Sequence, residues 1–492
     1  MKRSVLWLSA SVALLMGCRL HQVEAEPPPP LTVPESFRNT GGDAEAPDRW
    51  WESFADEALN TTIDAALSDN LNIRAAWARI EQGIAVVRKQ GSAYWPQLEA
   101  GLGVSGQRFY IEQPDMSAID VSQGLDNVTL PTTTESKDAG NVQLTVSTSW
   151  EADLWGRIAS MEDAALHDQL AGREDLSAVA VSLAAQVAET WFMLAEQSAL
   201  LALLQQQLAA NHALLELVEV RFTQGMVQAI DVRQQRQQVS SMESELPLIE
   251  GRLETLRTRL AVLIGVPPQQ DITMPAAELP LPPALPATGL PTTLLTRRPD
   301  VRAARLRVTA ADHRVGAAIA DQFPALRLSG RIGFSDDAID TFFLRWIYNL
   351  AANLVAPLFD GGRRSAEVAR TQAVVKERVN TFGQVVLDAL KEVEDALVLE
   401  ARQEQHLVAL QRSVEQAKQT LQNAKARYVS GLSDYLPVLG ALQTLQAAER
   451  REVSARRQRL SYRIQLHRAL GGAWAGELKA HDASESAPTE SP

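Results

Sequence analysis

A heptad spacing of apolar residues dominates the chain from about Leu176 to Leu263, with a single break near Gly225. A sustained heptad repeat indicates helices packed side by side in a supercoil. Because Gly225 can end one helix and the polar residues after it can start the next, the pattern predicts a long antiparallel hairpin. Its first arm, from Gly156, would be on the order of 100 Å long at about 1.5 Å per residue. The apolar positions are Val187, Leu194, Leu201, Leu208, Leu215 and Phe222, then Val232, Val239, Leu246, Leu253 and Leu260.

The same pattern occurs a second time, 206 residues later in the 492-residue chain. Five of the first six heptad positions map onto apolar or aromatic residues, and only Leu194 meets a polar residue, Glu400. Further matches are Gly225 with Gly431, Arg221 with Arg427, Gly156 with Gly362 and, at a shift of 228, Pro96 with Pro324. The chain is therefore a tandem duplication, which favours one intertwined body over three separate domains.

The composition excludes several classes of function. A net charge of −13 disfavours nucleic acid as a partner. The seven histidines have no metal-ligand spacing, and no glycine-rich phosphate loop is present, so we expect no enzyme, no metal and no dissociable cofactor. The single cysteine excludes an intramolecular disulfide. After the N-terminus, no stretch has the roughly 18 uninterrupted apolar residues of a membrane helix.

The N-terminus has the form of a secretory signal: Lys2 and Arg3 precede an apolar segment that ends at Cys18. This ending resembles the bacterial lipobox, in which the cysteine is lipidated and becomes the mature N-terminus. The alternative is an ordinary signal peptide with an incidental cysteine, but this is the only cysteine and it stands at the cleavage position. Arg19 replaces the aspartate of the familiar inner-membrane retention signal, which points to the outer membrane.

The apolar period changes to two between Pro96 and Gly156, which predicts two strands joined by a long polar loop. The second copy has a shorter version over about 325–355. Alternating strands with exposed edges cannot sit in lipid unless the sheet closes, and about eight strands is the smallest usual barrel. Four strands are too few, so several chains must pool theirs.

The domain organisation follows from these segments. We expect a signal peptide (1–17), a lipidated, proline-rich extended segment (18–48), a first repeat (49–265) with strands over about 97–152 and a hairpin over about 157–265, a proline-rich connector (266–295), a second repeat (296–475) with a hairpin over about 363–470, and a disordered tail (476–492).

Five motifs in this order resemble the outer membrane factors of the TolC/OprM class, and more closely the lipoprotein branch that serves RND efflux pumps. They lie at residues 50–54 (WWESF), 149–157 (SWEADLWGR), 295–304 (LTRRPDVRAA), 356–364 (APLFDGGRR) and 392–397 (EVEDAL). The resemblance covers about residues 50–475. It implies a mixed α/β membrane protein with the TolC-like fold, in which helical hairpins form a periplasmic tunnel and four strands per chain join a homotrimeric twelve-stranded barrel.

The resemblance also implies a function and partners. The chain would be the passive exit duct of a tripartite efflux pump, in contact with outer membrane lipid, a periplasmic adaptor and an inner-membrane RND-type transporter. The alternative is the exit duct of a type I protein secretion system. The belt around the tunnel would comprise the N-terminal segment, the connector and the C-terminal residues. The exported molecules cannot be read from the sequence.

In the family that this chain resembles, the periplasmic helix turns close the tunnel and contact the adaptor. The matching turns in this chain are residues 221–231 and 427–439. Leu436 matches a constricting leucine, whereas the acidic residue often found four positions later is here Gly440. The alternatives are that Leu436 is a core residue and that Asp434 is only the N-cap of the return helix. The gate candidates are Leu436, Asp231, Asp434, Arg221 and Arg427, with Gly225 and Gly431 as helix-turn glycines.

Overall fold

The computed structural model describes residues 20–39, 41–44, 47–114, 132–336, 342–472 and 474–478. The predicted lipid attachment at Cys18 lies outside these residues, as does most of the tail. The chain divides into two units: unit 1 comprises 1–24, 85–166 and 310–374, and unit 2 comprises 25–84, 167–309 and 375–492.

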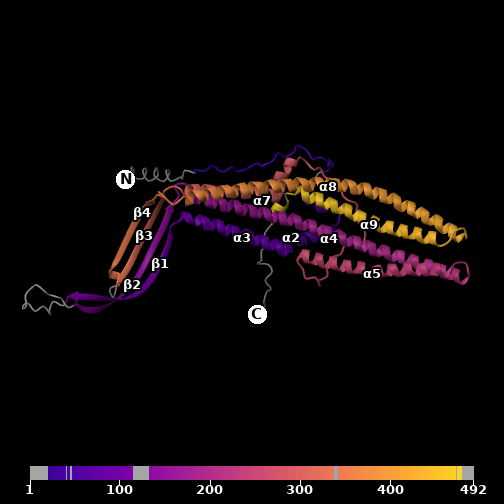
Figure 1. The fold of residues 1–492 in the computed structure, drawn as a ribbon, viewed down its shortest axis with the longest axis horizontal. Helices are drawn as coiled ribbons and strands as arrows, with labels where there is room; N and C mark the ends of the chain where they lie inside the picture. Colours follow the sequence, from indigo (N-terminus) through magenta and orange to yellow (C-terminus); the bar gives the residue numbers. More distant parts are fainter. Residues whose placement is uncertain are drawn as a thin grey trace, which may run out of the picture. The chain divides into compact units, whose positions relative to one another are not determined.

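Long helices and one four-stranded sheet account for most of the described residues (Figure 1). The elements are η1 (Trp50–Phe54), α2 (Glu57–Asp69), α3 (Leu71–Gly91), η2 (Ser92–Tyr94), β1 (Gln97–Pro114), β2 (Thr132–Ala152), α4 (Arg157–Thr223), α5 (Ala229–Ile264), η6 (Pro291–Thr293), α6 (Leu294–Arg297), α7 (Pro299–Ala320), β3 (Ala325–Asp336), η7 (Phe342–Leu344), β4 (Trp346–Val355), α8 (Arg363–Val429), α9 (Leu436–Leu470) and η8 (Trp474–Glu477).

Unit 1 contains the sheet, in which the strands lie side by side in chain order, β1-β2-β3-β4 (Figure 1). Every neighbouring pair is antiparallel, and one row crosses all four strands from Gln97 through Ser149 and Ser329 to Ala351. Just beyond the sheet, the Trp155 ring lies 5.1 Å from the Phe323 ring. This ring contact joins the segment that follows β2 to the segment that precedes β3.

Unit 2 is built on antiparallel helix pairs, α4 with α5 and α8 with α9. The heptad positions Val187 and Leu194 are fully buried, and Val239 on the returning helix is buried as well. The predicted fold class, helical hairpins combined with four strands in a duplicated chain, is confirmed. The last position of the first stripe is an exception: Phe222 is exposed, because it lies in the final turn of α4, before α5 has begun.

Glu400, the polar residue in the second heptad stripe, is buried beside Arg463 of α9. Arg463 Nε donates to Glu400 Oε2 at 3.0 Å, its Nη2 donates to Oε1, and its Nη1 donates to the carbonyl of Pro283 in the connector. A buried carboxylate requires a partner of this kind. The break in the heptad pattern is therefore the point at which the connector is tied to the second helix pair.

The motif around Arg298 joins three helices of unit 2. The guanidinium donates to Asp300, two residues further on, and Nη1 also donates to Glu392 of α8 at 2.8 Å and to the carbonyl of Ala469 of α9 at 3.0 Å. Arginine supplies several donors in a fixed planar arrangement, which suits a contact to several acceptors at once.

In unit 2, a cluster of aromatic rings connects the N-terminal segment η1 with the C-terminal residues. Trp51 lies edge-on to Trp474 of η8, with ring centroids 4.8 Å apart, and Trp50 stacks on His467. Burial lowers the pKa of His467 to about 3, so the stacked imidazole is neutral. The 3-10 helix η8 extends to Glu477, two residues into the predicted tail, and its buried residues are Trp474 and Ala475.

Among the described helices, one, α4, contains a window long and apolar enough to cross a membrane by length and composition alone. Sixty-seven per cent of that window is buried within the structure. The same test is passed by core helices of soluble proteins, and the packing of α4 in the core explains its apolar composition.

Candidate functional site

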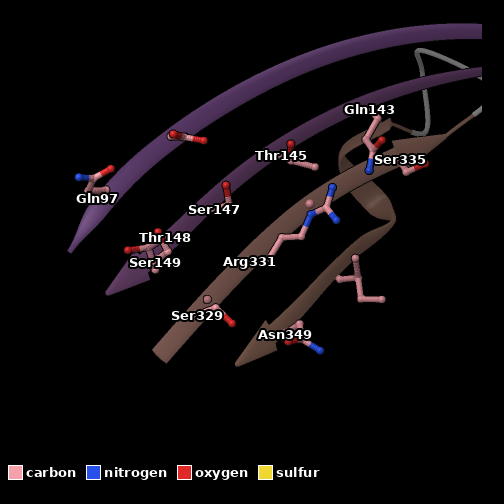
Figure 2. A pocket seen from close by; sticks show the side chains of 14 residues that line it. Gln97, Gln143, Thr145, Ser147, Thr148, Ser149, Ser329, Arg331, Ser335 and Asn349 are labelled. Atoms are coloured by element: carbon pink, nitrogen blue, oxygen red, sulfur yellow. The ribbon is translucent and has the colours of Figure 1, made fainter. Parts of the chain in front are cut away.

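The two faces of the sheet in unit 1 differ in chemistry. One face carries mainly small polar and charged side chains, with Ile347 as an apolar exception, and a hollow of about 560 Å³ lies against it. Figure 2 shows Ser147, Arg331 and Asn349, which occupy one row of this face. A face of this kind suits contact with water. Further residues along the hollow are Gln97, Gln143, Thr145, Ser149, Ser329 and Ser335.

The opposite face of the sheet is apolar, and its side chains are exposed or half-buried. Rows here read Ala100, Val146, Ile332 and Tyr348, and then Leu102, Leu144, Phe334 and Trp346. Strands of a transmembrane barrel alternate apolar side chains toward lipid with polar side chains toward the lumen. The sheet therefore has the two-sided character of a barrel wall, as the period of two predicted.

The two helix turns in unit 2 have the same backbone geometry. Gly225 and Gly431 adopt φ values of +75° and +72°. The next amide reaches back to the helix in both: Met226 N donates to Arg221 O and Leu432 N to Arg427 O, each at 2.9 Å. A Cβ at either glycine would meet no atom within 4 Å, so the left-handed backbone, and not crowding, favours glycine.

Arg221 links the first turn to the second. Its guanidinium donates to the carbonyls of Tyr428 and Val429 at 3.3 and 3.2 Å and lies 4.6 Å from the centre of the Tyr428 ring. These carbonyls belong to the last turn of α8, where intrahelical donors are absent and a cation is favoured. Arg221 thus stabilises the end of the neighbouring hairpin.

A series of buried polar side chains is joined by hydrogen bonds near the two turns. Tyr435 donates through its hydroxyl to Gln235 Oε1 at 2.5 Å, and Gln235 Nε2 donates to the carbonyl of Asn211 at 2.8 Å. Asn211 is fully buried and donates to Gln207 O and to Met242 Sδ. Burial raises the pKa of Tyr435 above its ordinary value, so the phenol stays protonated and donates.

This series of buried hydrogen bonds was not predicted from the sequence, although the sequence contains a signal for it. Gln207 and Asn211 lie four residues apart within the apolar stripe of α4, and Gln235 lies between two heptad positions of α5. Polar residues at core positions of a coiled coil specify register and partner. Such residues predict a hydrogen-bonded contact, but not the identity of the distant partner, Tyr435.

Leu436 is the first residue of α9 and is 60% exposed. The alternative that it is a core residue is therefore wrong for the single chain. Asp434 does not cap this helix: the cap residue is Tyr435, which makes no side-chain capping hydrogen bond, and Pro437 lies in the first turn. Asp434 was misjudged because the helix begins one residue later than an Asp434 cap requires.

Asp231 has a structural role at the start of α5, where its carboxylate accepts from the backbone amide of Gln228 at 3.0 Å in a capping box. Arg427, the repeat counterpart of Arg221, is exposed, and no ion pair joins it to another described residue. The turns thus bring Arg221 and Tyr435 into contacts while leaving Leu436, Asp434 and Arg427 exposed. Within the described residues, no group of three or more potential ligands could hold a metal ion.

A two-sided sheet and long antiparallel hairpins in one duplicated chain define the class of outer membrane channel proteins. Residues 62–266 and 290–472 match the family described as Outer membrane efflux protein. The chain belongs to this family, and its place is the outer membrane.

Curated relatives and solved structures agree with this assignment. The chain is 32% identical over 482 residues to the "Pyoverdine export outer membrane protein OpmQ" of Pseudomonas aeruginosa, covering 95% of this chain and 98% of that protein. It is 26% identical to the "Cation efflux system protein CusC" of Escherichia coli, covering 94% of this chain and 96% of that protein. The outer-membrane channel OprN is a structural neighbour with a TM-score of 0.81 and 25% identity, covering 93% of this chain and all of that chain.

Proposed function

We propose that three copies of this chain form the passive exit duct of a tripartite efflux pump. The observation that carries the proposal is the sheet, which has one polar face, one exposed apolar face and two edge strands, β1 and β4, without a partner in the described chain. Such a sheet is stable in lipid only when further strands close it. Three copies would supply twelve strands, within the range of outer membrane barrels.

The proposed partners are a periplasmic adaptor and an inner-membrane RND-type transporter. Energy and selection of cargo would come from the transporter, and the duct would be passive. Relatives named for pyoverdine export and cation efflux support a small-molecule cargo over a secreted protein.

The proposed gate lies at the two helix turns. Leu436 carries an exposed apolar side chain at the start of α9, and three copies near an axis would form an apolar constriction that discourages ions and water. Arg221 and Asp231 would stabilise the two turns through their hydrogen bonds to backbone atoms. Arg427 and Asp434 are exposed charged residues at the turns that would contact a neighbouring copy or the adaptor.

Planar bilayer recording tests the duct directly. Purified protein should insert and produce discrete conductance steps of one size, because a closed barrel gives one pore per assembly. Heat-denatured protein from the same preparation is the control. Insertion into the bilayer without any steps, in the wild type and in variants at Leu436, would contradict a duct.

We also propose that the mature chain is anchored by lipid on Cys18. A relative named "Probable outer membrane lipoprotein SilC", from Salmonella typhimurium, supports this. Metabolic labelling with a radioactive fatty acid should mark the wild type and leave Cys18→Ala unlabelled. Equal labelling of both proteins would remove the anchor from the account.

A further inference from the structure

The two edge strands of the sheet run in opposite directions. Because each neighbouring pair in the order β1-β2-β3-β4 is antiparallel, β1 and β4 are antiparallel to one another. The β4 edge of one copy can therefore pair with the β1 edge of the next and continue the same alternation. The end of β4 and the start of β1 then lie at the same rim of the closed sheet.

Large exposed apolar side chains gather at this rim on both edges. Leu358 and Phe359, just after β4, are 96% and 93% exposed. Trp95, just before β1, is 74% exposed, and Leu98 is similarly exposed. Contiguous exposed apolar residues of this size mark an interaction surface.

A contact between the corresponding segments already occurs within the chain, with Phe323 in the place of Trp95, although the residue that corresponds to Trp155 after β4 is Gly361. After β2, Trp155 packs on Phe323 and its Nε1 donates to the carbonyl of Pro324 at 2.7 Å, directly before β3. The duplication relates Pro324 to Pro96, before β1, and relates the junction after β2 to the junction after β4. The equivalent neighbour of the segment after β4 is thus the Trp95–Pro96 segment, which lies at the opposite edge and is available only from another copy.

The register required for closure agrees with this pairing. Within one copy the row of Gln97 ends at Ala351. Strands about 4.8 Å apart and tilted by about 40° shift by about 16 Å across four strands, or about five residues. Because the shift must keep each face continuous, it has to be an even number, about four or six residues. If Ala351 is moved from the row of Gln97 toward the C-terminal half of the next copy's β1, all of β4 stays opposite that strand, whereas the opposite shift moves β4 past its start. The allowed shift places Leu358 beside the start of β1 in the next copy.

We propose that Leu358 and Phe359 of one copy pack against Trp95 and Leu98 of a second copy, forming an apolar clasp at the rim where the strands meet the helices. The clasp rests on the three-copy assembly proposed above. It adds side-chain burial to the backbone hydrogen bonds of the closing strand pair, and three copies would form three clasps.

Cysteine cross-linking tests the clasp. Two double variants combine Leu358→Cys with Trp95→Cys or with Leu98→Cys, in a chain whose only natural cysteine is Cys18. Within one copy these positions lie at opposite edges of the sheet, so a short bismaleimide can join them only between copies. We expect a ladder of two and three linked chains on a denaturing gel.

The matched control combines Trp95→Cys with Leu344→Cys. Leu344 is also an exposed leucine, but it precedes β4, whose 10 residues separate it from the rim. Cross-linking of the test pairs but not of the control supports the clasp. A particle of three copies that forms no cross-link in either test pair overturns the clasp and leaves the duct intact, whereas a monomeric particle overturns both.

A stability measurement gives a second readout. Leu358→Ser combined with Phe359→Ser should lower the temperature at which the assembly dissociates, compared with Leu344→Ser. Equal dissociation temperatures for the two proteins would overturn the clasp even if the cysteine variants failed to assemble.

Discussion

At the scale of single residues, departures from the sequence pattern carry much of the information. Glu400 interrupts an otherwise apolar stripe, and the structure explains it through Arg463 and the Pro283 carbonyl. The sequence could predict that position 400 needs a partner, because a buried carboxylate without one is costly. It could not identify Arg463, because the partner lies on another helix, 63 residues away in the chain.

Leu436 is the residue whose side chain most directly tests the proposed gate. Because it is exposed in the single chain, Leu436→Ala removes little packing within one copy and should not unfold it. We expect a larger single-channel conductance in planar bilayers and greater sensitivity of cells to large antibiotics.

The control for this prediction is Leu432→Ala, since Leu432 is an exposed leucine in the same turn. If Leu436→Ala lowered the stability of the assembly by roughly 2–5 kcal/mol, as for a core leucine, and left conductance unchanged, the constriction would lie elsewhere. Asp231 and Asp434 would then be the next positions to test.

At the scale of elements, periodicity predicted the long helices and the alternating strands well. Helix α9 extends over Leu436–Leu470, as the second hairpin requires, and the strands alternate as the period of two indicates. The errors occur at helix ends, where the position of the first or last helical residue decides which side chains are capped or buried. Asp434 is not a cap, and the last position of the first stripe, Phe222, is exposed.

The hydrogen bond between Tyr435 of the second hairpin and Gln235 of the first leads to a prediction at this scale. Tyr435→Phe removes the donor to Gln235 and leaves a buried amide oxygen without its partner. The expected cost is about 1–3 kcal/mol in the free energy of unfolding, measured by denaturant titration. Tyr462→Phe is the control, because Tyr462 lies in α9, which Tyr435 precedes, and takes no part in the buried hydrogen-bonded chain.

The segments near the two helix turns should also open more often in the Tyr435→Phe protein. Amide hydrogen exchange around Asn211 and Gln235 should be faster, while exchange near Trp191 should stay the same. Unchanged exchange together with unchanged stability would mean that the hydroxyl does not couple the hairpins.

At the scale of the whole molecule, the sequence indicates that one chain is incomplete. Four amphipathic strands are recognisable from alternation, and the open edges of β1 and β4 agree with that inference. The number of copies could not be derived from the residues, because strand count and tilt together set a barrel and only the first is readable. The number three came from the resemblance.

The central claim is that closure of the sheet requires several copies, and the mass of the intact particle tests it most directly. The protein, extracted in mild detergent and kept unheated, should have the mass of three chains by native mass spectrometry. Denaturation should yield single chains from the same sample. A stable, folded particle with the mass of one chain would contradict the account.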